Sequence, residues 1–162
     1  MSNLDFTRTR TQKPRFRVWA LAVMLLTALF AIPSFVQAEP VRDVANMTNQ
    51  YRAKYGLKPL HISRNLERVA EAHGEDMARY SFFSHSGSDG SDIGDRALRA
   101  GYQYCVIAEN IAQGHRSAQA VTRGWIKSPG HRQNILDSDV TEIGVTRGRG
   151  NTWVMVLGSR TC

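Results

Sequence analysis

Cysteine is scarce in this chain of 162 residues, which has only Cys105 and Cys162 and no C-x-x-C pair. This excludes a disulfide-dense scaffold and gives no support for a cysteine-ligated zinc site or a thiol-redox site. If the chain is exported to an oxidising compartment, as the N-terminal segment discussed next indicates, an even cysteine count favours one disulfide. It would close a loop of about 57 residues and stabilise the fold by about 4 kcal/mol. Two free thiols are the alternative.

The sequence also lacks an apolar run of the roughly 20 residues that a helix needs to cross a bilayer. The run over 18–32 is shorter, follows a basic stretch, and is stopped by Pro33 ahead of small residues. This order is typical of a secretory signal peptide. We predict that residues 1–38 are a signal peptide cut after Ala38, and that 39–162 form one extracellular or periplasmic domain. An uncleaved, tilted membrane anchor is the alternative.

Acidic residues are few, with 14 Asp and Glu against 21 Lys and Arg, and the net charge is +7. Residues 1–38 contribute +4 of this, so the remaining chain carries only +3. The basic character is therefore mostly that of the N-terminal segment and does not indicate nucleic-acid binding. The remaining length suits one domain with one core and, we expect, one site.

Apolar residues recur at helical spacing through much of this domain. Gly56 is placed to end a first helix, Ser63 or Asn65 to cap a second, and the pair Asp92 and Asp95 to cap a short third. The predicted helices cover residues 41–55, about 66–77, from Asp92 through Ala100, and from Ser117 to the break at Ser128-Pro129-Gly130.

The C-terminal part has the composition of β-structure. Runs at 142–145 and 152–157 are separated by the glycine-containing segment 147–151, a pattern typical of a hairpin. The second run is apolar throughout, which predicts a central strand covered on both faces. The fold class we predict is α+β, with helices on both faces of a small antiparallel sheet, an α-β-α sandwich.

The five histidines differ in their surroundings. His73 lies on the apolar stripe of the second helix and is interpreted as a hydrogen-bonded core residue. His61 and His115 lack acidic neighbours and are interpreted as surface residues. His85 follows two phenylalanines in a polar loop, and His131 follows a sharp turn. These two are the candidates for a metal or acid–base site.

Glu109 is a lone carboxylate among apolar residues, so burial would raise its pKa unless a cation lies beside it. It is more than 20 residues from either His85 or His131, and the residue pattern alone leaves open whether the three share a site. A serine hydrolase built on Ser84, Ser86 or Ser128 with His131 is disfavoured, because no G-x-S-x-G surrounds any of these serines.

Four segments together resemble the signatures of the CAP superfamily, the SCP-like domain of cysteine-rich secretory proteins, antigen 5 and plant pathogenesis-related proteins. They are FSHSG at 83–87, AENIA at 108–112, WIKSPGHRQNIL at 125–136 and TEIGV at 141–145. The similarity is to the short bacterial branch and spans about residues 41–158. It implies an α-β-α sandwich with a cleft that can hold a divalent cation such as zinc.

Carried over by position, the resemblance makes His85, Glu109 and His131 the cleft and metal-binding residues. Two positions depart from the pattern. Ala108 replaces the glycine before the glutamate, and Ser128 stands where animal and plant members have a second cleft glutamate. Two imidazoles and one carboxylate remain, a set found in many catalytic zinc sites.

Two functions follow as hypotheses. The first is a non-enzymatic binding module for a lipid or another cell-envelope ligand. The second is a metal-dependent hydrolase or peptidase in the same cleft. A hydrolase needs a separate general base. The available acids, Asp89, Asp92 and Asp95, are more simply explained as turn and cap residues, so we favour the binding module. The sequence indicates no oligomeric state.

Overall fold

The computed structural model describes residues 35–162, and the predicted signal peptide, or anchor, lies outside this range except for residues 35–38. The elements, in order, are α1 (Phe35–Ala53), β1 (His61–Ile62), α2 (Arg64–Tyr80), α3 (Ile93–Arg99), β2 (Val106–Gln113), α4 (Ala118–Lys127), α5 (Pro129–Ile135), β3 (Glu142–Gly148), the 3-10 turn η1 (Arg149–Asn151) and β4 (Thr152–Ser159). None of the helices within the described range is long and apolar enough to cross a membrane.

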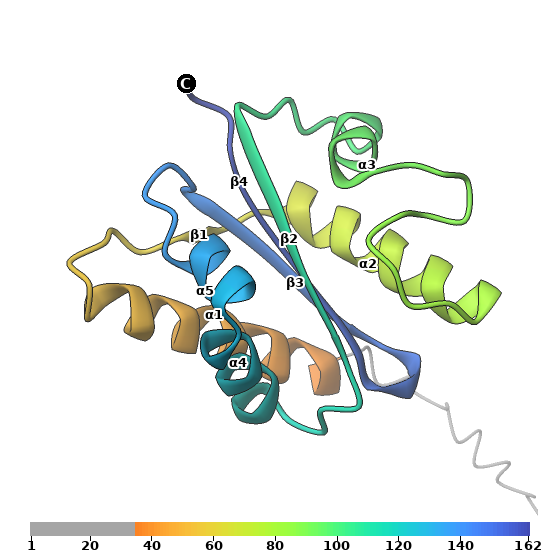
Figure 1. Cartoon of the computed structure of the whole chain (residues 1–162), viewed down its shortest axis with the longest axis horizontal. Helices are drawn as coiled ribbons and strands as arrows, with labels where there is room; N and C mark the ends of the chain where they lie inside the picture. Colours follow the sequence, from red (N-terminus) through yellow and green to blue (C-terminus); the bar gives the residue numbers. More distant parts are fainter. Residues whose placement is uncertain (1–34) are drawn as a thin grey trace, which may run out of the picture. The chain divides into compact units, whose positions relative to one another are not determined.

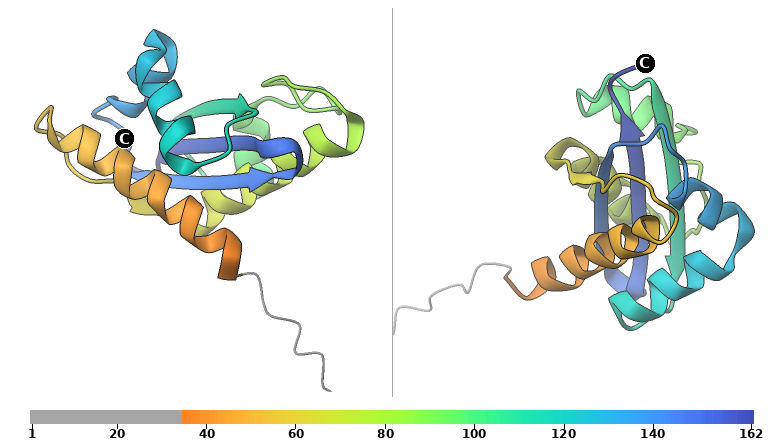
Figure 2. Two further views of the ribbon diagram at one scale, coloured as in Figure 1. Left: turned by 90° about the horizontal axis from the view of Figure 1, so that it is seen from below. Right: turned by 90° about the vertical axis from the view of Figure 1, so that its left-hand side faces the viewer.

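The four strands form one sheet in the order β1-β3-β4-β2. β4 pairs antiparallel with β3, as predicted, and also with β2, whereas β1 pairs parallel with β3, so the sheet is mixed. Helices α2 and α3 cover one face, and α1, α4 and α5 cover the other (Figures 1 and 2). The predicted α+β class and α-β-α sandwich are confirmed.

The central strand β4 joins the two halves of the core. All eight of its residues are buried. Because side chains alternate along a strand, Trp153, Met155 and Leu157 pack among α1, α4 and α5, whereas Val154 and Val156 pack under α2 and α3. The prediction of a strand covered on both faces is confirmed.

Several helix boundaries agree with the sequence analysis, but the start of α1 differs and one helix was not predicted. Asp92 and Asp95 form the expected capping box at the start of α3. However, α1 begins at Phe35 and continues through Pro40, earlier than the predicted 41–55. The predicted break at Ser128-Pro129-Gly130 is confirmed, since α4 ends at Lys127. A further helix, α5, which the sequence analysis did not predict, then starts at Pro129, a position where the missing N–H of proline costs no hydrogen bond.

Strand β2 is absent from the sequence prediction, because the polar pair Glu109-Asn110 interrupts its apolar pattern. It is nevertheless fully paired with β4, from Val106 opposite Ser159 to Gln113 opposite Thr152. As the last strand in the order, β2 forms an edge of the sheet. The glutamate that the sequence analysis singled out therefore lies in the middle of an edge strand.

Two further contacts hold the ends of the elements together. The disulfide between Cys105 and Cys162, predicted from the cysteine count, joins the chain end to the start of β2, with Cα atoms 5.3 Å apart. Gly144 of β3 lies directly under the first turn of α2. A Cβ atom there would come within 2.2 Å of the Leu66 carbonyl carbon, so this close packing requires glycine.

Candidate functional site

The Glu109 carboxylate is the centre of the candidate site. Its side chain is only 2% exposed, and both of its oxygens are engaged. Oε1 lies 2.8 Å from Nδ1 of His85, and Oε2 lies 2.8 Å from Nη2 of Arg96. Nε2 of His73 lies 3.8 Å from Oε1. A buried carboxylate is stable when it is paired and hydrogen-bonded in this way.

The ring of His85 is 60% exposed although one edge is fixed by Glu109. Because the carboxylate accepts, Nδ1 of His85 donates, and Nε2 of the neutral ring carries the lone pair. The loop beneath is held by Phe82, which packs against the α2 side of the core, and by the Ser84 carbonyl, which accepts from Nε2 of His73 at 2.9 Å. The exposed imidazole of His85 is thus carried by a loop that is anchored to the core.

His73 is the buried, hydrogen-bonded core histidine that its helical position predicted. Burial lowers its pKa, and Arg96 lowers it too, although Glu109 acts in the opposite direction. The other two histidines lie outside the site. His61 is exposed on β1, as predicted. His115 is half-buried rather than a surface residue, and its carbonyl accepts from the indole of Trp153.

His131 is held on the other side of β2 by the residue next to Glu109. The side-chain amide of Asn110 donates to the His131 carbonyl at 3.0 Å, and Asn134 donates to the Asn110 side-chain oxygen at 2.9 Å. These bonds attach α5 to β2. Burial lowers the pKa of His131, and so does the charge of His85. The structure therefore pairs His85 with Glu109 and ties the backbone of His131 to the neighbouring residue Asn110.

Sequence reasoning missed four members of this cluster, which are His73 as a neighbour of the carboxylate, Arg96, Asn110 and Asn134. A signal for Arg96 was present, because it stands on the helical stripe formed with Ile93, Ala97 and Ala100, where an apolar residue is expected. A charged residue at such a position needs a buried partner of opposite charge.

The acids considered as a general base have structural partners. Asp92 and Asp95 bond each other's backbone N–H groups at the start of α3. Asp89 accepts from the Ser91 N–H and from Arg99, and these bonds hold its pKa well below the usual range. The structure thus agrees with their interpretation as turn and cap residues.

The resemblance implies a metal ion, and the donor set decides whether one fits. Within residues 35–162, no three His, Cys, Asp or Glu side chains are grouped so as to hold a metal ion. Both oxygens of Glu109 are already taken, by Arg96 and His85. Glu109 in this arrangement does not fit as a ligand, and only the imidazoles of His85 and His131 remain as donors.

Taken together, the sandwich and the cluster around Glu109 define a CAP-type domain. The family model for CAP, the cysteine-rich secretory protein family, matches residues 45–157, and the chain belongs to this family.

Two curated relatives are from Bacillus subtilis, and both are described as uncharacterized. The protein YkwD is 38% identical over 113 residues, which are 70% of this chain and 44% of YkwD. The membrane protein YlbC is 33% identical over 110 residues, which are 68% of this chain and 32% of YlbC. The chain thus matches less than half the length of these relatives.

Solved structures share the fold. An extracellular protein containing an SCP domain from Bacillus anthracis aligns with a TM-score of 0.72 and 28% identity, over 76% of this chain and 41% of that one. An outer surface protein from Borrelia burgdorferi aligns with a TM-score of 0.67 and 22% identity, over 74% of this chain and 92% of that one. A cysteine-rich secretory protein from Staphylococcus aureus also aligns, with a TM-score of 0.67 and 21% identity, over 78% of this chain and 40% of that one.

Proposed function

We propose that the protein is an exported, non-enzymatic binding module that takes a lipid or another cell-envelope component, with the imidazoles of His85 and His131 as its polar contacts. The observation that carries this proposal is the ion pair between Glu109 and Arg96, 2.8 Å apart and buried. A carboxylate held on both oxygens serves to position His85, and it is not free to take a proton from a substrate or a water molecule.

Export is supported by two independent observations. The N-terminal sequence has the signal-peptide pattern described above. The Bacillus anthracis neighbour, 28% identical, is described as an extracellular protein. Neither observation distinguishes the periplasm from the outside of the cell, and the proposal covers both.

A metal-dependent hydrolase is the second candidate, and one observation favours it. The lowered pKa of His131 keeps its imidazole neutral, which is the form that binds a cation such as zinc. When bound, zinc would polarise a carbonyl group or a water molecule. His85 and His131 would hold it, while Glu109 would fix the tautomer of His85 from behind. Peptide or ester hydrolysis would in addition need a base, which no side chain described above supplies.

The test uses the full chain with its own N-terminal segment, recovered from the exported fraction of the producing cells. Co-purifying lipids and envelope fragments are identified by mass spectrometry, and vesicles of the host's polar lipids are tested by co-sedimentation. We expect ligand on the unmodified protein and loss of ligand in the variant His85→Ala/His131→Ala. His61→Ala, an exposed histidine on β1, is the matched control and should retain it.

Two results would contradict the binding proposal. In the first, the unmodified protein carries no ligand above background. In the second, the double variant carries as much ligand as the unmodified protein. Zinc calorimetry on the same three proteins separates the second candidate from the first. Stoichiometric zinc binding that the double variant loses, together with cleavage of a peptide or ester library by the loaded protein, would establish the hydrolase instead.

A further inference from the structure

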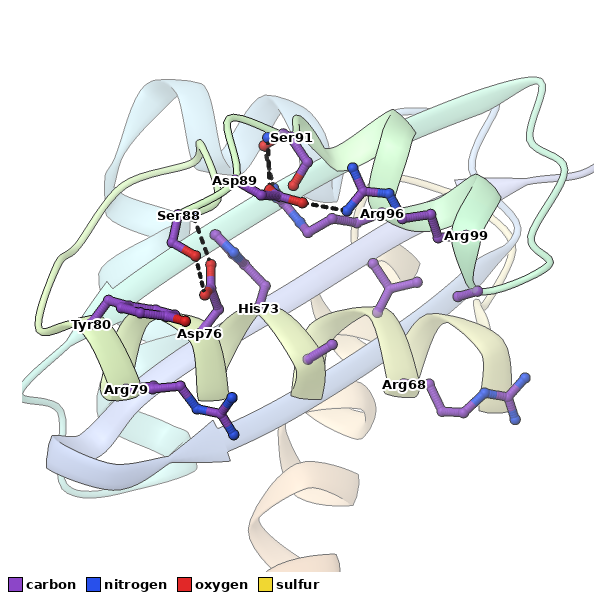
Figure 3. Close-up of a pocket in the computed structure, with 13 residues that line it drawn as sticks. Arg68, His73, Asp76, Arg79, Tyr80, Ser88, Asp89, Ser91, Arg96 and Arg99 are labelled. Carbon is purple, nitrogen blue, oxygen red and sulfur yellow. Dashed lines mark hydrogen bonds and ion pairs between the residues drawn. The ribbon is translucent and has the colours of Figure 1, made fainter.

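A cavity of about 480 Å³ lies between α2 and α3, beside the loop that connects them. One stripe of α2 forms its floor, and α3 contributes Arg96 and Arg99 to its lining (Figure 3). None of His85, Glu109 and His131 is among its lining residues. The cavity therefore shares His73 and Arg96 with the cluster around Glu109, which lies behind its inner wall, but it is distinct from the place where His85 is exposed.

The lining is rich in positive charge. Four arginines face two aspartates, and both aspartates already have partners. Asp89 is paired with Arg99 at 2.5 Å, and Asp76 accepts from the Ser88 N–H and hydroxyl at 2.8 and 2.6 Å. Arg68 and Arg79, which are exposed, have no acidic partner within the described chain. Their charge is left for a ligand.

The inner wall is formed by two buried polar side chains. Arg96 is about nine-tenths buried and spends its terminal nitrogens on Glu109 and on the Ser91 carbonyl. Nε2 of His73 donates to the Ser84 carbonyl. Nε of Arg96 and Nδ1 of His73 have no partner, but both atoms are closed to solvent, so the exposed arginines are the groups that a ligand in the groove can contact.

We propose that this groove is a second binding site, which takes a phosphate-bearing ligand. Guanidinium groups match phosphate oxygens in geometry and charge. Arg68 and Arg79 lie at opposite ends of the α2 stripe, about 16 Å apart along the helix axis, so a ligand with more than one phosphate group can reach both. Ala72 and Tyr80 on the same stripe offer apolar surface to the uncharged part of the ligand.

An exported protein can meet such phosphate groups in two forms. They are the headgroups of phospholipids at a membrane surface and soluble phosphate polymers. The full-length exported protein is therefore titrated with tripolyphosphate, and separately mixed with phosphatidylcholine vesicles with and without phosphatidylglycerol. Binding to the anionic vesicles alone assigns the site to headgroups. Binding to tripolyphosphate alone assigns it to soluble phosphate. Either result supports the proposal.

The variant Arg68→Ala/Arg79→Ala removes two charges from the groove, and Arg42→Ala/Arg123→Ala removes two exposed arginines from α1 and α4 on the other face of the sheet. We expect the first to weaken binding about tenfold and the second less than about twofold at low salt. As a second readout, the guanidinium resonances of Arg68 and Arg79 should shift on addition of tripolyphosphate.

Three results would overturn the proposal. The first is that neither probe binds, and the second is that the two double arginine variants weaken probe binding equally. The third is that citrate binds as tightly as tripolyphosphate. The variant His85→Ala/His131→Ala separates this site from the proposed function, because it should lose the cleft ligand and still bind the phosphate probe.

Discussion

The guanidinium of Arg96 lies 2.8 Å from the carboxylate of Glu109, and both groups are buried. A buried charge that loses its partner is costly, whereas apolar replacement of both members of a pair is often nearly neutral. We expect Arg96→Met to lower the free energy of unfolding by about 3 to 5 kcal/mol. The double variant Arg96→Met/Glu109→Met should recover most of this loss, as measured by urea unfolding.

Arg99→Met is the control for this experiment, because Arg99 lies on the same helix but is exposed and pairs only with the exposed Asp89. It should cost much less than Arg96→Met. If the losses in the two single variants at Arg96 and Glu109 simply add in the double variant, the pair is not the anchor of the site described here.

Lower pH should weaken the fold through the buried His73 and the half-buried His131. The pKa values of His73 and His131 are lowered, in both cases mainly by burial, so the unfolded chain binds more protons than the folded chain below about pH 6.5. The full contribution of these neutral histidines to stability is present above about pH 6.5, and it is lost as the pH falls toward their pKa values in the folded protein. Over that range each histidine lowers the folding equilibrium constant by at most about tenfold per pH unit.

Urea unfolding at pH 7.5, 6.5 and 5.5 measures this slope. The variant His73→Gln keeps a donor for the Ser84 carbonyl but does not titrate, so its slope should be smaller. A stability that is constant or rises as the pH falls over this range would contradict the burial of neutral histidines.

The contact between α2 and β3 should not tolerate a side chain at Gly144. A methyl group there would overlap the backbone of Leu66 and Glu67, which cannot move aside as a flexible side chain can. We expect Gly144→Ala to lower the free energy of unfolding by about 3 kcal/mol. Gly130→Ala, where no atom lies within 4 Å, should be neutral or slightly stabilising. Equal effects of the two substitutions would show that the predicted overlap is absent.

The disulfide between Cys105 and Cys162 closes a loop with a sequence separation of 57 residues. Reduction, or the variant Cys105→Ser/Cys162→Ser, should lower the free energy of unfolding by about 4 kcal/mol in the chain-entropy model. Thiol labelling followed by mass spectrometry checks the bridge directly. Native, unreduced protein should take up no label, and alkylation of both cysteines would refute the pairing.

The fold could be predicted from the sequence wherever one physical signal dominated. The uniform apolarity of β4 and the acidic pair at Asp92 and Asp95 each had a single explanation, and the structure agrees with both. Prediction was incomplete where two signals competed. Pro129 has the properties of a residue that ends α4 and of one that starts α5, and it does both.

The candidate site was predictable only in part. Its two candidate histidines were named from residue type and family resemblance, because His85 and His131 lie in segments with little other reason for a histidine. The partners that hold them were not named, since Arg96 and Asn110 act through long-range contacts that spacing along the chain does not reveal.

Glu109 and Asn110 are consecutive residues of β2, yet one fixes His85 against α2 and α3 and the other fixes α5, which carries His131. Two adjacent residues of one strand thus support the two histidines of the site, each from a different face of the sheet. A slip of β2 by one residue against β4 would turn each side chain to the wrong face and separate the histidines from their supports. The register of one edge strand therefore sets the alignment of both imidazoles, and an insertion or deletion within 106–113 would dismantle the site even if every residue that forms it were retained.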